Sequence, residues 1–240
     1  MLTSPIKTDL GCSLRERPVT GAQSDKRGIY AVIPALNEKG TIGQIVSSVM
    51  CYAGSVVVVD DGSTDGTAEL ASAAGAHTIV HSINRGYDVS IDDGFRYVAR
   101  QNDAKIVFTF DADGQHRPET IPALLEPLLD DNADIVVGTR PRKARIAEKL
   151  LGLYTELRYG IVDPLCGLKG YKIGVFQDIG FFDRINSIGT ELMLRAIRKG
   201  YRVVQMPISV GPRADHSRFG QSIRGNYRIF LAFLRIVFFL

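Results

Sequence analysis

The sequence lacks several features that would assign it to a simple class of protein. Its 240 residues include only three cysteines, Cys12, Cys51 and Cys166, whose wide spacing fits free thiols in a reducing compartment better than disulfides or a zinc site. The net charge of +3 is too small to predict a nucleic-acid-binding surface. The first 28 residues contain no apolar core of a secretory signal, and no stretch reaches the ~20 apolar residues of a membrane-spanning helix. We therefore expect a cytoplasmic protein without a nucleic-acid partner.

Two common phosphate-binding loops are also missing. No Gly-x-Gly-x-x-Gly follows the first expected strand, and no Gly-Lys-Ser/Thr loop occurs anywhere in the chain. These absences argue against a dinucleotide cofactor and against a P-loop enzyme. Residues 34–40 also lack the Gly-rich basic loop that a nucleotidyltransferase normally carries after its first strand.

Short apolar runs alternate with helical patterns from about residue 29 onward. Runs at 30–33, 55–59, 77–80, 106–110 and 135–138 predict strands, and the amphipathic segments between them predict helices. This alternation predicts an α/β fold with a mostly parallel sheet covered by helices on both faces. We expect a mobile tail over residues 1–27, a folded domain over 28–222 and an apolar helix over 223–240.

The most informative stretch is Asp111-Ala-Asp113-Gly-Gln115, which follows the strand at 106–110. Residues two apart in extended backbone point to the same side, so three side-chain oxygens can face one ligand. Such oxygens suit Mg²⁺ or Mn²⁺ that keeps open positions for a phosphorylated substrate. A polar turn in which an aspartate caps the next helix is the alternative.

Three further polar turns follow strand ends, at residues 34–38, 60–65 and 84–86. In parallel sheets ligands bind beyond the carboxyl ends of the strands, so these turns and the one at 111–115 predict a single crevice. The carboxylates of Asp60 and Asp61 suit the N–H and hydroxyl groups of a nucleoside rather than a bare phosphate. Helix capping is again the alternative for each aspartate alone.

Taken in order, five motifs resemble family-2 glycosyltransferases: Pro34-Ala-Leu-Asn37-Glu38, Asp60-Asp61-Gly-Ser-Thr-Asp-Gly-Thr67, Asn84-Arg-Gly86, Asp111-Ala-Asp113-Gly-Gln115 and Gly138-Thr-Arg140. Gln115, together with Asp163-Pro-Leu-Cys-Gly167 and Arg218-Phe-Gly-Gln-Ser222, is similar to the polyprenyl-phosphate branch of the dolichyl-phosphate mannose synthase type. The resemblance covers about residues 29 to 225.

The resemblance implies a GT-A fold, a UDP- or GDP-sugar donor, Mg²⁺ or Mn²⁺ as cofactor and inversion at the anomeric carbon. It assigns metal binding to Asp111, Asp113 and Gln115. It assigns nucleotide-sugar binding to a larger set: Pro34, Ala35, Asn37, Glu38, Asp60, Asp61, Asn84, Gly86, Asp111 and Ala112. The metal would withdraw charge from the departing diphosphate.

The nature of the acceptor decides whether a base is needed. A polyprenyl phosphate is already anionic and needs cations, for which the candidates are Arg140, Arg145, Arg213 and Arg218, with Ser222 beside them. A glycan or small-molecule hydroxyl would need a base, and Asp163 is the candidate. Asp163 and Arg140 are thus the expected catalytic residues, with a structural cap as the alternative for Asp163. A binding module with an inactive site is the remaining alternative.

The chain departs from the family pattern at Asp88, where a second glycine is common, and Asp92 and Asp93 follow it. This acidity could alter the donor pocket, but we expect these carboxylates to face water. Residues 229–240 are apolar on nearly every face, which fits a core helix or an oligomer contact. Because arginines precede it, this segment is also suited to a membrane interface, and we expect membrane association near a lipid acceptor.

Overall fold

The computed structural model describes residues 26–141, 145–211 and 223–240. The strands are β1 (Ile29–Ala35), β2 (Ser55–Asp60), β3 (His77–Val80), β4 (Ile106–Thr109), β5 (Ile135–Thr139), β6 (Lys169–Lys172) and β7 (Val203–Pro207). The helices are α1 (Ile42–Val49), α2 (Thr67–Ala73), α3 (Tyr87–Ala99), the 3₁₀ turn η1 (Pro118–Thr120), α4 (Ile121–Leu129), α5 (Ile146–Tyr159), α6 (Ile173–Ile179), α7 (Glu191–Arg198) and α8 (Ile223–Phe239). The tail expected at residues 1–27 lies almost wholly outside the described residues.

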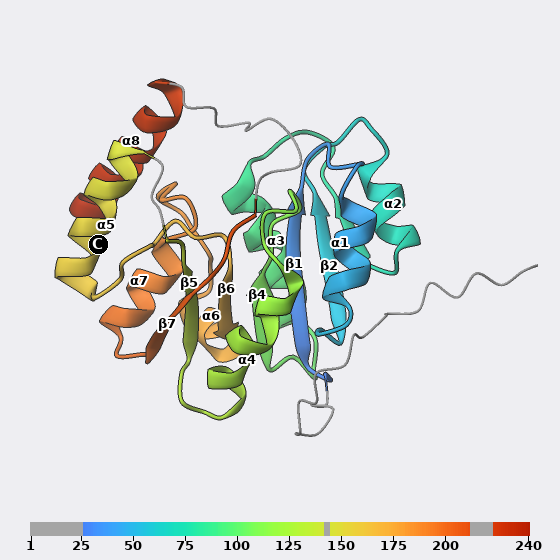
Figure 1. The fold of residues 1–240 in the computed structure, drawn as a ribbon, viewed down its shortest axis with the longest axis horizontal. Helices are drawn as coiled ribbons and strands as arrows, with labels where there is room; N and C mark the ends of the chain where they lie inside the picture. Colours follow the sequence, from blue (N-terminus) through green and yellow to red (C-terminus); the bar gives the residue numbers. More distant parts are fainter. Residues whose placement is uncertain (1–25, 142–144, 212–222) are drawn as a thin grey trace, which may run out of the picture.

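The strands form one seven-stranded sheet in the order β3-β2-β1-β4-β6-β5-β7 (Figure 1). All neighbouring strands are parallel except β6, which runs antiparallel to both β4 and β5. The predicted α/β fold with a mostly parallel sheet is therefore confirmed. Because β6 is reversed, its first residue rather than its last lies at the edge where the parallel strands end.

The central strands are buried on both faces, which explains their continuous apolar sequences. In β1 the side chains of Ile29, Ala31 and Ile33 enter one core, while Tyr30 and Val32 enter the other. Both cores are built from such alternating side chains, so the sheet is held from its two sides.

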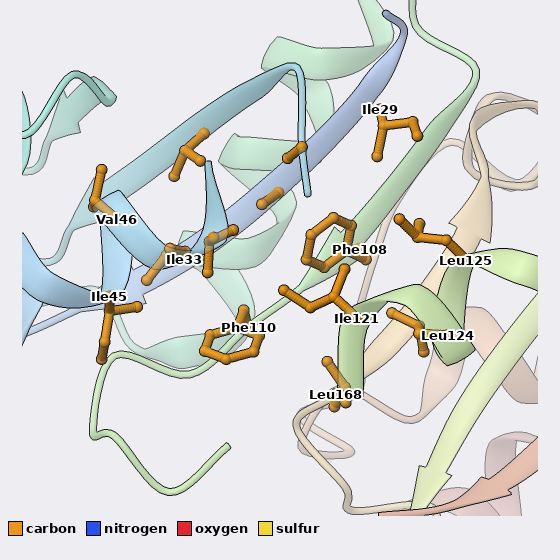
Figure 2. Close-up of a cluster of buried hydrophobic side chains, with 14 of the residues drawn as sticks. Ile29, Ile33, Ile45, Val46, Phe108, Phe110, Ile121, Leu124, Leu125 and Leu168 are labelled. Carbon is orange, nitrogen blue, oxygen red and sulfur yellow. The ribbon is translucent and has the colours of Figure 1, made fainter. Parts of the chain in front are cut away.

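Helices α1, α2 and α4 cover the first face. Figure 2 shows its centre, where Phe108 and Phe110 from the β4 region meet Ile45 and Val46 of α1 and Leu124 of α4. The buried Phe110 immediately precedes the segment that carries Asp111 and Asp113. The metal-binding candidates therefore extend from a well-packed support.

Helices α3, α5, α6, α7 and α8 contribute to the second core. Helix α3 approaches β1 closely because residue 94 is glycine: a Cβ there would lie 2.4 Å from Val32 Cγ1. At the end of the molecule far from α2, α8 packs on α5, with the Tyr154 and Phe233 rings 5.6 Å apart (Figure 1). No helix in the described ranges is long and apolar enough to cross a membrane.

Candidate active site

Hydrogen bonds join the loops after β1 and β2. The Asn37 backbone N–H donates to Ser63 Oγ at 2.8 Å, and the Thr64 N–H donates to Asn37 Oδ1 at 2.9 Å. The Glu38 N–H donates to Thr67 Oγ1 at 2.8 Å. Asn37 has a left-handed φ of 50°, a conformation that asparagine tolerates better than most residues. Asn37 therefore joins the loops after β1 and β2, and its predicted contact with the nucleotide stays a prediction.

One of the two carboxylate oxygens of Asp60 has no hydrogen-bond partner within the described residues. Asp60 is buried at the end of β2, where Oδ1 accepts the Ser63 N–H at 2.7 Å. Its Oδ2 is buried and has no hydrogen-bond partner in the described part of the chain. Leaving a buried acceptor unmatched costs free energy, so Oδ2 is suited to an N–H or O–H group of a bound nucleoside.

Both carboxylate oxygens of Asp61, unlike those of Asp60, accept hydrogen bonds from the backbone. Its Oδ1 accepts the Arg85 N–H at 2.8 Å, and its Oδ2 accepts the Gly86 N–H at 2.8 Å. His81 Nδ1 lies 2.7 Å from the same Oδ1, and His81 Nε2 lies 3.1 Å from Asp93 Oδ2. Asp61 thus holds the 84–86 loop in place, while the predicted nucleotide contact of Asn84 and Gly86 stays a prediction.

The 111–115 loop supplies the oxygen atoms expected for a metal. Asp113 Oδ1 accepts the Gln115 N–H at 3.0 Å, which forms a tight turn around Gly114. Thr41 Oγ donates to the Ala112 carbonyl at 2.7 Å and ties this loop to the start of α1. Within the described ranges no three His, Cys, Asp or Glu side chains gather as a metal site. Two carboxylates and the Gln115 amide nevertheless fit Mg²⁺ or Mn²⁺ that takes its other ligands from a diphosphate.

His116 and Gly167 are neighbours of Asp111, and neither was predicted to contact it. The buried His116 donates from Nε2 to Asp111 Oδ2 at 3.1 Å. Burial alone would lower the pKa of His116, but the hydrogen bond and the negative charge of Asp111 raise it above its ordinary value. A Cβ at Gly167 would lie 2.0 Å from the same Asp111 Oδ2, so the absence of a side chain at residue 167 leaves room for this carboxylate in its present orientation.

The two residues predicted to be catalytic, Arg140 and Asp163, bind each other. Arg140 Nε donates to Asp163 Oδ2 and Nη2 donates to Oδ1, both at 2.8 Å, and the Arg140 backbone N–H adds a third bond at 3.1 Å. Burial alone would raise the pKa of Asp163, but these bonds and the Arg140 charge hold it below its ordinary value. The same partner raises the pKa of Arg140 further. Asp163 is therefore an ionised carboxylate with weak affinity for a proton.

Glu148 contacts both Arg140 and a second arginine, Arg145. Its carboxylate lies 3.5 Å from Arg145 Nη1 and 3.8 Å from Arg140 Nη2. Glu148 lies one helical turn after Arg145, which is the signal that could have predicted this contact. The other acceptor candidates, Arg213, Arg218 and Ser222, lie outside the described residues.

The expectation that Asp88 faces water is wrong. Its Oδ1 is buried, and burial together with the nearby Asp183 raises the pKa of Asp88 to about 7. The buried Lys169, whose Nζ donates to the Gly189 carbonyl at 2.6 Å, opposes this rise. An acidic group that is partly protonated near neutrality therefore lies at the start of α3, beside the 84–86 loop.

Asp92 and Asp93 are also bonded within the fold. Asp92 accepts the Phe182 N–H at 2.7 Å and Arg96 Nε at 2.6 Å. Asp93 accepts Arg85 Nη1 at 2.7 Å in addition to its contact with His81. Both carboxylates hold neighbouring elements on α3, and neither simply faces solvent.

A model described as "Glycosyl transferase family 2" matches residues 30–155, which is more than half of the chain. The chain belongs to glycosyltransferase family 2. It is a glycosyltransferase, as the order of its motifs predicted, and the match includes every predicted donor and metal residue from Pro34 to Gln115. The individual roles of these residues stay predictions.

Relatives of this glycosyltransferase include enzymes with lipid acceptors. An uncharacterized protein from Methanocaldococcus jannaschii is 31% identical over 200 residues, which are 77% of this chain and 82% of that protein. Polyprenol monophosphomannose synthase from Mycolicibacterium smegmatis is 30% identical over 206 residues, 76% of this chain and 77% of that protein. The resemblance to polyprenyl-phosphate sugar transferases is thereby confirmed.

Among solved structures, glucosyl-3-phosphoglycerate synthase from Mycobacterium tuberculosis, in complex with Mg²⁺ and UDP, is similar with a TM-score of 0.68. The match covers 87% of this chain and 79% of that chain, at 19% identity. At this identity the likeness concerns the fold alone, and it confirms the predicted GT-A architecture.

Proposed function

We propose that this glycosyltransferase moves a sugar from a UDP- or GDP-sugar to a polyprenyl phosphate, with Mg²⁺ or Mn²⁺ and with inversion at the anomeric carbon. The observation that carries the proposal is the ion pair between Arg140 and Asp163 at the acceptor end. The name of the mycobacterial relative, which acts on a polyprenol phosphate, supports the same acceptor class.

The ion pair favours a phosphate over a hydroxyl acceptor. A hydroxyl must lose its proton to a base as it attacks, whereas a phosphate oxygen is already anionic. Asp163 is a poor base because Arg140 lowers its pKa. Arg140, in contrast, has five N–H donors on its guanidinium; within the described residues two of them bond to Asp163, and Glu148 lies 3.8 Å from Nη2. We assign the further donors to the acceptor phosphate.

On the donor side, we assign the buried Oδ2 of Asp60 to the nucleoside. Asp61, Asn37 and Glu38 hold the loops that surround it. Asp111, Asp113 and Gln115 would hold the metal ion, which when bound stabilises the negative charge of the departing diphosphate. His116 and Gly167 keep Asp111 in its orientation for that task.

A lipid acceptor places the reaction at a membrane surface, and we propose the cytoplasmic face, where nucleotide sugars are available. The proposal is tested by incubating the purified protein with a panel of UDP- and GDP-sugars, Mn²⁺ or Mg²⁺, and a short-chain polyprenyl phosphate, and by measuring nucleoside diphosphate release. We expect release that the lipid phosphate stimulates and that Asp113→Ala abolishes. The control is Asp130→Ala, which alters an exposed aspartate beyond α4.

Two results would contradict the proposal. Metal-dependent release that ignores the lipid phosphate but responds to a glycan would move the acceptor to a hydroxyl. No release with any donor, despite nucleotide binding, would leave a sugar-nucleotide-binding module.

A further inference from the structure

The outward face of α5 is apolar. Ile146, Leu150, Leu153 and Leu157 recur every three or four residues and form one stripe along the helix, and they are 75%, 49%, 54% and 80% exposed. A surface helix of a globular protein normally turns its apolar stripe inward and its polar residues outward. Here Leu151 and Ala147 already fill the inward face, so the outward stripe is additional.

Helix α8 widens this apolar surface. It lies beside α5 at the end of the molecule opposite α2 (Figure 1). The Phe230 ring lies 6.3 Å from Phe233, which in turn contacts Tyr154 of α5. Phe230 and Tyr227 are both exposed, so α8 adds aromatic surface beside α5. We call the exposed apolar residues of α5 and α8 the α5–α8 face.

Positive charge accompanies the α5–α8 face. Lys149 and Arg158 are exposed on α5, and Arg228 is exposed on α8. The segment 223–240 contains three arginines and neither aspartate nor glutamate. Helix α5 contains two glutamates. Glu148 is buried beside Arg140 and Arg145, so Glu156 is the exposed acidic residue of this helix. Apolar side chains flanked by lysine and arginine are the composition of helices that lie in a membrane interface.

We propose that the α5–α8 face docks on an anionic lipid bilayer, with both helices lying along the membrane surface. Exposed apolar area of this kind marks an interaction site. A second copy of the chain is a poorer partner, because a twofold contact would bring the same cationic residues of two copies together. Anionic lipid headgroups complement those charges, and the apolar side chains can enter the headgroup layer.

Docking would also orient the catalytic site. Helix α5 begins immediately after Arg145, and its first exposed apolar residue is Ile146. The acceptor arginines therefore lie at one end of the α5–α8 face. This step rests on the proposed function, since it concerns a lipid-phosphate acceptor, whereas membrane docking itself does not depend on the reaction.

The test is sedimentation of the full chain with vesicles of phosphatidylcholine and phosphatidylglycerol. We expect binding to anionic vesicles, at least tenfold weaker binding for Leu153→Asn with Leu157→Asn, and unchanged binding for the control Leu70→Asn with Val80→Asn. The control residues are exposed on α2 and on β3, the strand at the opposite edge of the sheet from β5 and β7. Unchanged thermal unfolding of both variants would show that each still folds.

Equal binding by the α5 variant and the wild type would overturn the proposal. The proposal would also be overturned if the wild type did not bind vesicles but formed a dimer, and the α5 variant were monomeric. The α5–α8 face would then be a protein interface. Sugar transfer to a water-soluble short-chain polyprenyl phosphate separates the two proposals. Transfer without vesicle binding would overturn docking alone, and vesicle binding without transfer would support docking while contradicting the lipid-phosphate acceptor.

Discussion

Arg140 and Asp163 stand 23 residues apart in the sequence and meet in a bidentate ion pair, with two N–O distances of 2.8 Å. The pair joins the end of β5 to the segment that enters β6. Because each group partly neutralises the other, the pair consists of an arginine fixed in orientation and a carboxylate whose pKa is lowered.

Asp163→Asn tests which role this carboxylate has. We expect kcat for transfer to a polyprenyl phosphate to fall less than about tenfold, whereas the loss of a general base costs about 10²–10⁴-fold. Arg140→Lys should instead raise KM for the lipid phosphate, because lysine cannot bind it in bidentate fashion. Steady-state kinetics on both variants distinguish the roles, and a thousandfold fall in kcat for Asp163→Asn alone would identify Asp163 as the base.

The same variant carries a pH signature. Asp163 has a lowered pKa in the folded state, so its ion pair stabilises the fold above the ordinary aspartate pKa of about 3.9 and stops doing so as pH falls through the folded-state value. We expect Asp163→Asn to lower the free energy of unfolding by about 1–3 kcal/mol at neutral pH, since Arg140 is only partly buried. Urea unfolding should show this difference shrinking below about pH 4; a difference that grows on acidification would contradict the assignment.

Gly167→Ala tests the support of Asp111. A Cβ at this position overlaps Asp111 Oδ2, and a carboxylate can rotate away, so we expect a folded protein with a displaced Asp111. Outer contacts of this kind typically change metal affinity by about 10–100-fold. Mn²⁺ binding in the presence of UDP, measured by calorimetry, should weaken by that amount.

Gly174→Ala is the matched control for that substitution. Residue 174 lies in α6, and a Cβ there meets no atom within 4 Å. We expect unchanged Mn²⁺ binding and a slightly more stable helix. If both alanine variants changed Mn²⁺ affinity equally, or if Gly167→Ala did not change it, Asp111 would not depend on the space beside Gly167.

Asp60→Asn tests the nucleoside contact. Its Oδ1 can still accept the Ser63 N–H, while an amide would replace the buried oxygen that lacks a partner. We expect UDP or GDP affinity to fall by about 1–3 kcal/mol, because a donor would then face the ligand's own donor. Calorimetry of nucleotide binding measures this, and unchanged affinity would place the nucleoside elsewhere.

Asp88→Asn should change how stability depends on pH. The folded-state pKa of Asp88 is raised to about 7, so the folded protein holds this proton more tightly than the unfolded chain does. Stability should therefore fall as pH rises from about 4 towards 7, and then level off. Between pH 5 and pH 7, we expect the free energy of unfolding of the asparagine variant to decline by about 1–2 kcal/mol less than that of the wild type. Thermal unfolding at both pH values measures this difference. The control Asp130→Asn, at an exposed site, should show the same decline in stability as the wild type.

Much of the fold could be predicted because its strands are buried on both faces. The four valines of β2 and the β-branched run of β4 leave few alternatives to a central strand, and alternation with helices then indicates a parallel sheet. The reversed direction of β6 could not be predicted. Its four residues are Lys169-Gly-Tyr-Lys172, whose pairing depends on β4 and β5 and not on their own composition.

The donor-binding role of the loops after β1, β2, β3 and β4 stays a prediction, but their convergence was predictable because their motifs occur in order, each after a strand. The acceptor side was not, since Arg140, Asp163 and Glu148 act on one another across loops and a helix. Asp88 shows the same limit: its partners, Asp183 and Lys169, lie 80 or more residues further along the chain. A charged residue in an amphipathic segment looks exposed until its distant partners are known.

The place of β6 between β4 and β5 has a consequence for how the protein folds. β4 and β5 follow each other in the sequence but pair only through β6, which is synthesised later. Until residues 169–172 insert, the sheet consists of one part around β1 and another that begins with β5. Such non-local pairing is slow to form. The insertion that joins the two parts also brings Gly167 to Asp111 and Asp163 to Arg140, so a chain that stalls before this step has neither a complete sheet nor this ion pair.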